Sequence, residues 1–376
     1  RSHRVTTTWH LLTGEYPPAS GGVGDYTAAL ASELARRGHA VHVWSPSVPP
    51  DTPDGEVHFH ALPDRFGSRS RRALQSIWGS SPGIVLLQYV PNALGAGGLN
   101  LPFCRWLQRA AGRSDVRVMF HEPYFYFSWN PAGNVRAIVQ RLMAGMLVGA
   151  SRTVYVSTET WRRYLPQSSR LTVLPVPSTI PRGCDADAAA RFRARIAPAP
   201  GAAVVGHFGT YGDHVGGALE PVVPLVLDRS SAQFVCIGRG GDRFAAALRA
   251  RHPAFAGRIH HTGALASSDV AAAIRACDVM LQPYPDGITT RRTSVMAALT
   301  NGVATVSTDG ALTEAVWRSS GAVALAPAND ARAIATTAIG LLGDSTARAE
   351  LAAAGRRAYD AHFAIENSVD TLLRQP

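Results

Sequence analysis

One segment of the sequence, Pro283–Ser294, gathers side chains that suit a diphosphate group. It carries Arg291 and Arg292, three threonines and a serine, and it leads into a helix expected over Val295–Thr300. Guanidinium groups, hydroxyl groups and the free amides of a helix start all bind phosphate oxygens. A solvated arginine pair beside an N-cap serine or threonine is the structural alternative. We favour the diphosphate interpretation, because ligands of parallel sheets bind beyond the carboxyl ends of the strands.

Three glycine-rich loops also follow expected strands. They span Gly14–Tyr26, Gly206–Gly212 and Gly238–Gly241. Glycine lets backbone N–H groups approach an anion closely, and a following helix adds the positive end of its dipole. The first loop lacks the GxGxxG spacing of a dinucleotide site, and Trp44-Ser45 stand where that site needs an acidic residue. Ordinary turns that cap helices are the structural alternative. The length of the first loop favours a ligand, whereas each of the other two loops alone is weak evidence.

A histidine ends another expected strand, Arg117–His121. Such a residue points to the ligand edge of a parallel sheet and can donate a hydrogen bond to a hydroxyl group or an oxyanion. Glu122 follows it, and then come the aromatic residues of Tyr124–Phe127 and Trp129. Aromatic faces suit sugar rings or a lipid chain. A hydrogen-bonded scaffold histidine beside an aromatic core cluster is the alternative interpretation.

Short apolar runs alternate with helical patterns along the whole chain, which is typical of parallel βαβ units. The strands are expected at Val5–Leu12, Ala40–Trp44, Val57–Ala61, Gly83–Gln88, Arg117–His121, Arg152–Val156, Leu171–Pro175, Ala203–Phe208, Gln233–Ile237, Ile259–Thr262, Val279–Pro283 and Val303–Thr308. The pattern predicts an α/β fold of two Rossmann-like, doubly wound domains that face each other across a cleft.

The expected domain limits follow from a break at Pro198–Gly201, after a helix expected at Asp185–Ala197. We expect an N-terminal domain over residues 1–183, a linker over 184–201 and a C-terminal domain over 202–360. The last residues, 361–376, are expected to return to the N-terminal domain.

The composition excludes several classes of protein. The net charge is +10, and all 37 basic residues are arginine. Without lysine there is no Schiff base, no pyridoxal phosphate anchor and no P-loop. The arginine excess fits composition bias better than nucleic-acid binding. The four cysteines form no CxxC pair, so we expect no metal site.

Contact with a membrane is a separate question. No apolar run of about 18 residues is present, so a cytoplasmic protein is expected. The basic stretch Arg65–Arg72 fits peripheral contact with anionic lipid head groups of the inner leaflet, or a solvated loop, and the loop is the stronger interpretation.

The order of these motifs resembles the nucleotide-sugar glycosyltransferases of family 4. The resemblance covers almost the whole chain and rests on Glu15–Tyr26, Leu34–Val41, His121, Leu174–Ser178 and Gly302–Glu314. It implies a GT-B fold, with the acceptor bound mainly by the first domain and the nucleotide sugar by the second. It also implies metal-independent transfer of a hexose-type sugar to a hydroxyl acceptor, commonly with retention at the anomeric carbon, and no cofactor besides the donor.

The loops and the resemblance together give a set of candidate residues. The catalytic candidates are His121, Asp286, Arg291 and Arg292. His121 would contact the donor sugar or stabilise charge near the transferred carbon, and Asp286 would hold sugar hydroxyl groups. The residues expected to bind the donor are Gly22, Gly24, Gly209, Thr210, Gly238, Gly287, Ile288, Thr289, Thr290, Thr293 and Ser294. The residues expected to bind the acceptor are Asp25, Glu122 and Tyr124. Glu314 matches an acidic position of the family, without a defined role.

The sequence departs from the family pattern at two places. The family's paired glutamates are replaced by Asp286 and Ser294, or by Thr289 and Ala297 when counted back from Gly302. The arginine and lysine usual after the first strand of the second domain are missing, and we expect Arg291 and Arg292 to supply that charge.

Several functions stay open at this stage. A catalytically silent sugar-nucleotide-binding protein, a nicotinamide-dependent oxidoreductase, and an epimerase or phosphorylase on the same fold are the alternatives. The acceptor fits a cell-envelope polysaccharide, a lipid-linked intermediate or a small natural product.

Overall fold

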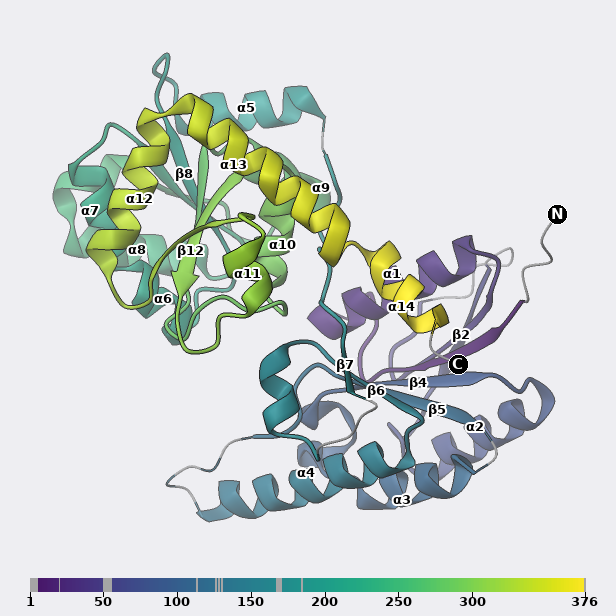
Figure 1. Cartoon of the computed structure of the whole chain (residues 1–376). Helices are drawn as coiled ribbons and strands as arrows, with labels where there is room; N and C mark the ends of the chain where they lie inside the picture. The colour runs from purple at the N-terminus through teal and green to yellow at the C-terminus, as the bar shows by residue number, and fades with distance from the viewer. Residues whose placement is uncertain are drawn as a thin grey trace. The chain divides into compact units, whose positions relative to one another are not determined.

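The computed structural model describes residues 6–19, 21–49, 56–112, 114–125, 127, 129, 131–166, 171–183 and 185–374. Four residues of the expected elements and motifs lie outside these ranges, namely Val5, Ser20, Tyr126 and Cys184. The chain forms two compact units (Figure 1). Unit 1 contains Arg1–Val176 and Ile365–Pro376, and unit 2 contains Pro177–Ala364.

Unit 1 is built on a parallel sheet. Among its described residues the sheet has seven strands in the order β3-β2-β1-β4-β5-β6-β7. The strands are β1 (Thr8–Leu12), β2 (Ala40–Ser45), β3 (Val57–Ala61), β4 (Ile84–Tyr89), β5 (Asp115–Phe120), β6 (Thr153–Val156) and β7 (Leu171–Val173). The inner strands are buried on both faces, which explains why they read as continuous apolar runs such as Ile84–Tyr89.

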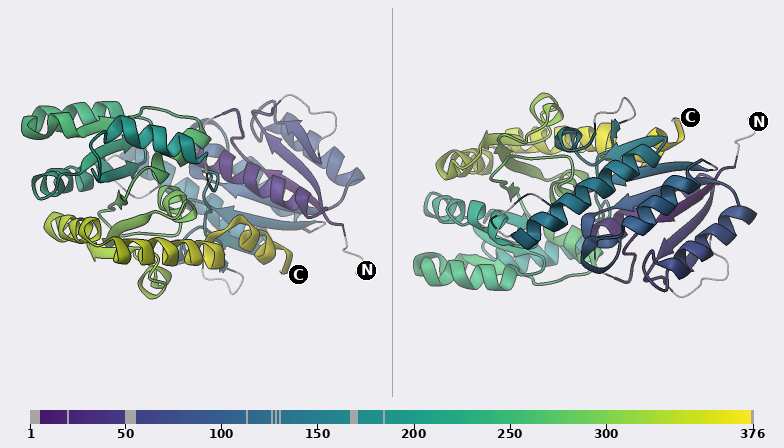
Figure 2. Two further views of the ribbon diagram at one scale, coloured as in Figure 1. Left: turned by 90° about the horizontal axis from the view of Figure 1, so that it is seen from above. Right: turned by 90° about the horizontal axis from the view of Figure 1, so that it is seen from below.

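Helices cover both faces of this sheet (Figures 1 and 2). Residues of α2, α3 and α4 pack in one core, and residues of α1 and α14 pack in the other. The helices of unit 1 are α1 (Gly22–Arg36), α2 (Ser68–Ser80), η1 (Pro91–Ala93), η2 (Ala96–Gly98), α3 (Leu101–Ala110), α4 (Pro131–Ala150), η3 (Glu159–Arg163) and α14 (Ile365–Arg374).

The C-terminal helix α14 belongs to unit 1. Arg37 pairs with Asp370, and Nη1 of Arg117 donates to the backbone oxygen of Leu372 at 2.7 Å. The side chains of Val369 and Leu372 are fully buried in the core that α1 also lines. The structure therefore starts the returning segment at Ile365.

Unit 2 is built on a second parallel sheet. Among the described residues it has six strands in the order β10-β9-β8-β11-β12-β13. The strands are β8 (Val204–Phe208), β9 (Gln233–Ile237), β10 (Ile259–His261), β11 (Val279–Gln282), β12 (Ala304–Asp309) and β13 (Ala324–Pro327). The helices are α5 (Ala186–Ile196), α6 (Asp213–Leu219), α7 (Val222–Asp228), α8 (Gly241–Arg251), η4 (Pro253–Arg258), α9 (Ser267–Arg275), α10 (Thr293–Thr300), α11 (Ala315–Ser319), α12 (Ala331–Gly343), α13 (Ser345–Ala358) and η5 (Tyr359–Phe363).

The prediction of two doubly wound parallel sheets is confirmed, and the strand orders locate their ligand edges. In unit 1 the order reverses between β1 and β4, and in unit 2 it reverses between β8 and β11. In such sheets ligands bind beyond the carboxyl ends of the strands at this reversal. The loops after β1, β5, β8, β9 and β11 are those singled out from the sequence.

Three segments differ from the expected organisation. Residues 184–201, expected as a linker, contain helix α5, whose Phe192 and Ile196 are buried in the core of unit 2 with residues of α9. The basic stretch Arg65–Arg72 largely joins α2, because Asp64 accepts hydrogen bonds from the first amides of that helix. Strand β13 was not expected.

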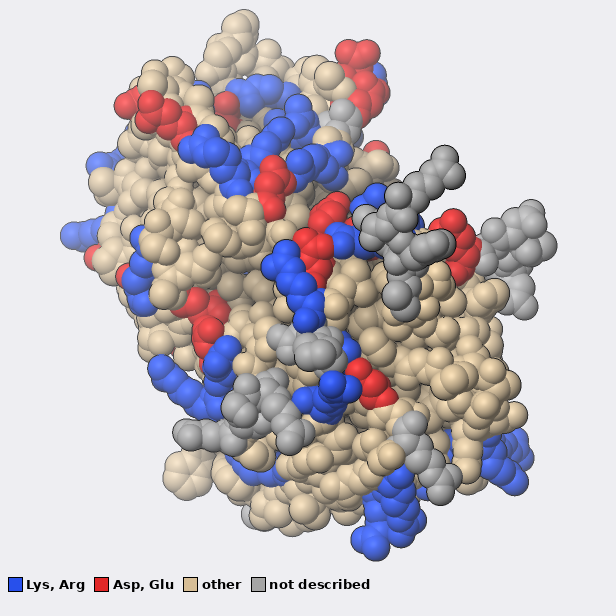
Figure 3. All heavy atoms as spheres, turned by 45° about the vertical axis from the view of Figure 1, so that its right-hand side comes forward, with Lys and Arg blue, Asp and Glu red and all other residues tan. Residues whose placement is uncertain are grey.

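The surface shows how the arginines are distributed. On the face drawn in Figure 3, the arginines lie in several separate groups, many with an acidic side chain beside them. Within the described part of the chain no helix is both long and apolar enough to cross a membrane.

Candidate functional site

The loops after β8 and β9 pack backbone against backbone. Gly238 has φ +109° and Gly240 has φ +84°, which other residues rarely adopt. A Cβ atom on Gly238 would stand 2.6 Å from the backbone oxygen of Gly209, and one on Gly240 would stand 3.0 Å from that of Thr210. Glycine at both positions therefore brings the two loops together at the carboxyl edge of the sheet.

The loop after β11 is held against the loop after β12. Gly287 has φ +94°, and a Cβ atom there would lie 2.7 Å from the backbone nitrogen of Gly310. The backbone oxygen of Asp286 accepts a hydrogen bond from the amide of Leu312 at 2.8 Å. Ile288 donates its amide to Thr308 and buries its side chain completely. Residues 286–288 are thus fixed within unit 2.

Glu314 fastens the next residue of this loop. Its carboxylate accepts hydrogen bonds from the amide and, at 2.9 Å, from the hydroxyl group of Thr290, and its side chain is buried. The sequence pointed to Glu314 without a role, and the structure gives it the role of positioning the loop that leads to Arg291.

Several backbone amides of the loop after β11 bind within the loop and not, as expected, a ligand. We expected Gly287–Thr290 to offer backbone donors to the ligand. The amide of Gly287 donates to Tyr284, that of Ile288 to Thr308 and that of Thr290 to Glu314. These three amides are engaged inside the loop, because the tight turn at Gly287 folds them inward. The Thr289 hydroxyl group is buried without a hydrogen-bond partner in the described structure.

The two arginines stand at the start of α10. The Arg292 guanidinium lies 4.2 Å above the ring of Tyr284, and both arginines are half-buried. The Tyr284 hydroxyl group and Oγ of Ser294 are 2.9 Å apart. Burial raises the pKa of Tyr284, so the ring stays neutral under the cation. Among the described residues no side chain caps α10, and the two arginines directly precede the positive end of this helix.

Asp286 and His214 link the loops after β11 and β8. Oδ2 of Asp286 lies 3.4 Å from Nε2 of His214 in α6, and 54% of the Asp286 side chain is exposed. An exposed carboxylate at this edge can accept hydrogen bonds from hydroxyl groups of a ligand. The sequence analysis did not single out His214, since its approach to Asp286 depends on the tertiary fold.

His121 in unit 1 is a neutral, buried side chain. Burial lowers its pKa to about 3, so the ring carries no charge at neutral pH. Nε2 lies 2.8 Å from Oε1 of Gln88, and Nε2 of that buried amide has no hydrogen-bond partner in the described structure. The N–H of the neutral ring is directed to Gln88, so any contact of His121 with a ligand is made by a neutral side chain.

A carboxylate occupies the start of α1 in unit 1. Oε1 of Glu15 accepts hydrogen bonds from the amides of Val23 at 3.0 Å and Gly24 at 3.1 Å. A Cβ atom on Gly21 would collide with this carboxylate, and one on Gly24 would stand 3.2 Å from the Glu15 backbone. Glu15 thus holds the place that we expected the donor diphosphate to take beside Gly22 and Gly24.

The expected acceptor residues lie in two places in unit 1, at the start of α1 and after β5. Burial, with the negative charge of Glu15, raises the pKa of Asp25. Tyr124 donates its hydroxyl group to the backbone of Tyr164 and lies under the Arg141 guanidinium at 4.2 Å. Glu122 is half-buried. Only Asp25 lies on the same loop and helix start as Glu15.

Sequence reasoning missed several residues that shape these sites. Glu15 was included in a motif, but its contact with the amides eight and nine residues later depends on how the loop folds. Gln88 is the last residue of one expected strand, His207 is the last but one of another, and both are buried. Nδ1 of His207 donates to the backbone of Leu281 at 2.7 Å, and its Nε2 has no partner in the described structure. A polar residue at the end of an apolar strand was the available signal.

Comparisons with known proteins identify the class. The two Rossmann-like sheets, with glycine-rich loops at their ligand edges, give the architecture with which the comparisons agree. The family model of Glycosyltransferase Family 4 matches residues 20–187, and that of Glycosyl transferases group 1 matches residues 199–344. The chain therefore belongs to glycosyltransferase family 4, and it is a glycosyltransferase, not a nicotinamide-dependent oxidoreductase.

Solved structures share the fold over nearly the full chain. Sucrose-phosphate synthase from Thermosynechococcus elongatus is 17% identical, with a TM-score of 0.67 and 98% of each chain covered. HepE from Anabaena, in complex with UDP and glucose, is 12% identical, with a TM-score of 0.70 and 98% of each chain covered. The α,α-trehalose-phosphate synthase from Burkholderia xenovorans, in complex with glucose-6-phosphate, is 11% identical, with a TM-score of 0.69, and 98% of this chain and 99% of that chain are covered. No curated protein sequence matches the chain significantly. At these identities the likeness confirms the GT-B fold.

Proposed function

We propose that this glycosyltransferase moves a hexose-type sugar from a nucleoside diphosphate to a hydroxyl group of an acceptor. The observation that carries the proposal is the convergence of four loops at the carboxyl edge of the unit 2 sheet. Backbone contacts between Gly209 and Gly238 and between Gly287 and Gly310 join these loops in two pairs, and the approach of His214 to Asp286 links the pairs. Arg291 and Arg292 stand at the uncapped start of α10 in this group of loops, which we call the donor cradle.

Two arginines and a helix start supply what the leaving group needs. When the bond from the anomeric carbon to the diphosphate oxygen breaks, negative charge grows on the diphosphate. Guanidinium groups aimed at it in advance stabilise that charge without reorganisation. Thr293 and Ser294, at the same helix start, would hydrogen-bond phosphate or ribose oxygens, and Asp286 would accept hydrogen bonds from the sugar.

We further propose transfer without a metal ion and with retention. Among the described residues no group of three or more His, Cys, Asp and Glu side chains is arranged to hold a metal ion. The positive charge is supplied instead by Arg291 and Arg292. In the retaining route the acceptor oxygen bonds to the anomeric carbon on the face that the diphosphate leaves, and the leaving diphosphate takes the acceptor's proton. Activity that persists in excess EDTA, with a product of unchanged anomeric configuration by NMR, supports this route.

Unit 1 would bind the acceptor. Asp25 is partly buried with a raised pKa, which suits hydrogen bonding to a hydroxyl group. Glu122 and Tyr124, after β5, would line the same edge of the sheet. His121, neutral and directed to Gln88, would act there through hydrogen bonds and not through charge.

An exposed apolar surface in unit 1 supports a peripheral role at a membrane. Phe127 and Trp129 precede α4, and Val135, Ile138 and Leu142 lie along one side of that helix; each of these side chains is more than half exposed. Arg136 is exposed on the same helix. Aromatic, apolar and cationic side chains together suit the interface of an anionic bilayer. Sedimentation with phosphatidylglycerol vesicles tests this, and binding that is equal for wild type and Ile138→Glu plus Leu142→Glu contradicts it.

The test of the main proposal is a calorimetric screen of UDP- and GDP-sugars, with NAD as the control. The proposal expects one nucleotide sugar to bind and to be hydrolysed slowly without acceptor. Binding without any hydrolysis or transfer supports the catalytically silent alternative. Absence of binding by every nucleotide sugar contradicts the proposal.

A further inference from the structure

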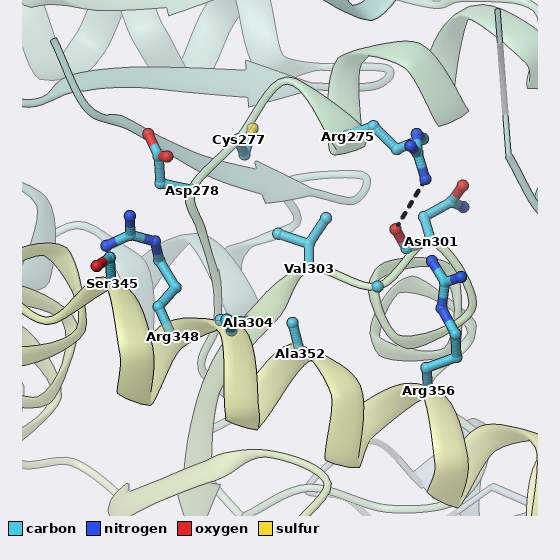
Figure 4. A pocket seen from close by; sticks show the side chains of 12 residues that line it. Arg275, Cys277, Asp278, Asn301, Val303, Ala304, Ser345, Arg348, Ala352 and Arg356 are labelled. Carbon is cyan, nitrogen blue, oxygen red and sulfur yellow. Dashed lines mark hydrogen bonds between the residues drawn. The ribbon is translucent and has the colours of Figure 1, made fainter. Parts of the chain in front are cut away.

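A second cavity lies in unit 2, at the opposite edge of its sheet from the donor cradle. It has a volume of about 410 Å³ and is bordered by residues just before β11 and at the start of β12, and by one side of α13 (Figure 4). A volume of this size accommodates a small metabolite. None of the residues expected to bind the donor lines it.

Three arginines line this cavity without acidic partners. In the described structure Arg275, Arg348 and Arg356 form no ion pair. Nη1 of Arg275 donates to the backbone oxygen of Asn301 at 3.4 Å, and Nη1 of Arg348 donates to that of Leu341 at 2.7 Å. Each guanidinium has five N–H donors, so most remain for a ligand.

Arg275 and Arg356 form one end of the cavity. Figure 4 shows both guanidinium groups beside Asn301. Arg356 also lies over Gly302, which has φ +66° and where a Cβ atom would collide with the guanidinium. Two cations that share one end, with free donors, form a site for a phosphate group.

The other end of the cavity is polar but carries less net charge. Oδ2 of Asp278 accepts hydrogen bonds at 2.8 Å from Nη2 of Arg193 and from the amide of Val204. Oδ1 of Asp278 has no hydrogen-bond partner among the described residues. It can therefore accept a hydrogen bond from a ligand hydroxyl group, and Ser345 is exposed at the same end.

The middle of the cavity is apolar. Val303, Ala304 and Ala352 lie between the two ends in Figure 4. A ligand that fits this order has a phosphate group at one end, a carbon skeleton in the middle and hydroxyl groups at the other end.

The arginines also have a structural role that must be separated from binding. Arg275 ends α9, and Arg348 donates to carbonyl groups at the end of α12. Such contacts neutralise helix C-termini. They use one guanidinium nitrogen of Arg275 and one of Arg348, and the side chain of Arg356 makes no hydrogen bond to any described residue. Arg356 lies in the last turn of α13, where its charge also favours the helix end, but this role leaves its guanidinium donors available for a ligand.

We propose that this cavity binds a soluble phosphate ester of a small polyol or sugar. The phosphate group lies between Arg275 and Arg356, and a hydroxyl group at the other end donates to Asp278. The site is separate from the donor cradle, and only the UDP control of its test rests on the proposed function.

The experiment is calorimetric titration of the full chain with glucose 6-phosphate, inorganic phosphate and glucose, each in saturating UDP so that the cradle is filled. The ester is expected to bind more tightly than either smaller probe. Ala352→Phe fills the cavity and should weaken binding of the ester about tenfold or more, while Ala353→Phe, exposed on the same helix, should leave it unchanged.

A second pair of variants tests the charge. Arg356→Gln should weaken binding of the ester about tenfold, and Arg357→Gln, on the exposed side of α13, should not. UDP affinity should be unchanged in all four variants, which separates this site from the donor cradle. Equal ester affinity in Ala352→Phe and Ala353→Phe, or equal affinity for the ester and inorganic phosphate, overturns the proposal.

Discussion

Glu15 makes a strong test of where the diphosphate binds in unit 1. Its carboxylate accepts hydrogen bonds from the amides of Val23 and Gly24 at the start of α1. These amides belong to the loop that was expected to bind the donor diphosphate through Gly22 and Gly24. If the diphosphate uses them, it must first displace Glu15, so the carboxylate competes with the donor.

The magnitude follows from the role of Glu15 as a helix cap. Removal of a side chain that caps a helix start costs about 0.5–2 kcal/mol of stability. Glu15→Ala should therefore lower the free energy of unfolding by about 1–2 kcal/mol, as measured in urea. In the variant, UDP no longer has to displace the carboxylate from these amides, so this free energy of about 1–2 kcal/mol is not subtracted from its binding free energy. UDP should therefore bind about 5- to 30-fold more tightly.

Asp64→Ala is the matched control. Asp64 caps α2 through the amides of Arg69 at 2.8 Å and Ser70 at 2.9 Å, away from the glycine loop in sequence. Its removal should also lower the free energy of unfolding, but it should leave the UDP dissociation constant unchanged. Glu15→Gln keeps an acceptor without the charge and should fall between wild type and Glu15→Ala in UDP affinity.

Calorimetry with UDP shows whether the diphosphate uses the amides at the start of α1. If Glu15→Ala is less stable than wild type but binds UDP equally or more weakly, Glu15 is only a helix cap and the diphosphate does not use the amides of α1. That result would confine the diphosphate site to unit 2.

Three further predictions follow from the contacts. Glu314→Ala leaves the buried amide and hydroxyl group of Thr290 without this acceptor. The variant should lose about 1–3 kcal/mol of unfolding free energy for each group, and its kcat/KM should fall. Unchanged stability and an unchanged rate would show that the loop does not depend on Glu314. Gly287→Ala places a Cβ atom against the backbone of Gly310 and should reduce both stability and donor affinity. Gly217→Ala, whose Cβ atom meets open space, should reduce neither. Similar melting temperatures for the two variants would refute the steric argument. Burial lowers the pKa of His121 to about 3 and of His207 to about 4, so the folded state takes up fewer protons than the unfolded state below pH 6.5. Stability should therefore be fully present above pH 6.5 and fall as the pH drops towards 4, by up to about 1.4 kcal/mol per pH unit for each histidine. An NMR titration should show the His121 ring neutral down to pH 5, and a midpoint near 6.5 would contradict its burial.

The fold was largely predictable because it depends on local patterns. Strand β9 has the predicted bounds, Gln233–Ile237, because an apolar run between turn residues defines a buried parallel strand. The helix in residues 184–201 was recognised, but its assignment to a linker was not supported, since its packing through Phe192 and Ile196 depends on partners distant in sequence.

The place of the candidate loop was predictable from the sequence, and its hydrogen bonds were not. The segment Pro283–Ser294 lies at the ligand edge of the unit 2 sheet, as its position after a strand indicated. The hydrogen bond between Thr290 and Glu314 joins residues 24 positions apart, and the hydrogen bond between His121 and Gln88 joins residues 33 positions apart. No spacing in the sequence indicates such pairs, because tertiary packing alone brings them into contact.

The central claim is that Arg291 and Arg292 bind the donor diphosphate at the start of α10. Calorimetry that compares UDP and GDP binding by wild type with binding by Arg291→Ala plus Arg292→Ala tests it directly, with Arg332→Ala, exposed on α12, as the control. The account predicts that the double variant loses measurable binding and that transfer falls by about 10²–10³ or more, while the control is unaffected. Equal affinity and equal transfer rates in the double variant and wild type would contradict it.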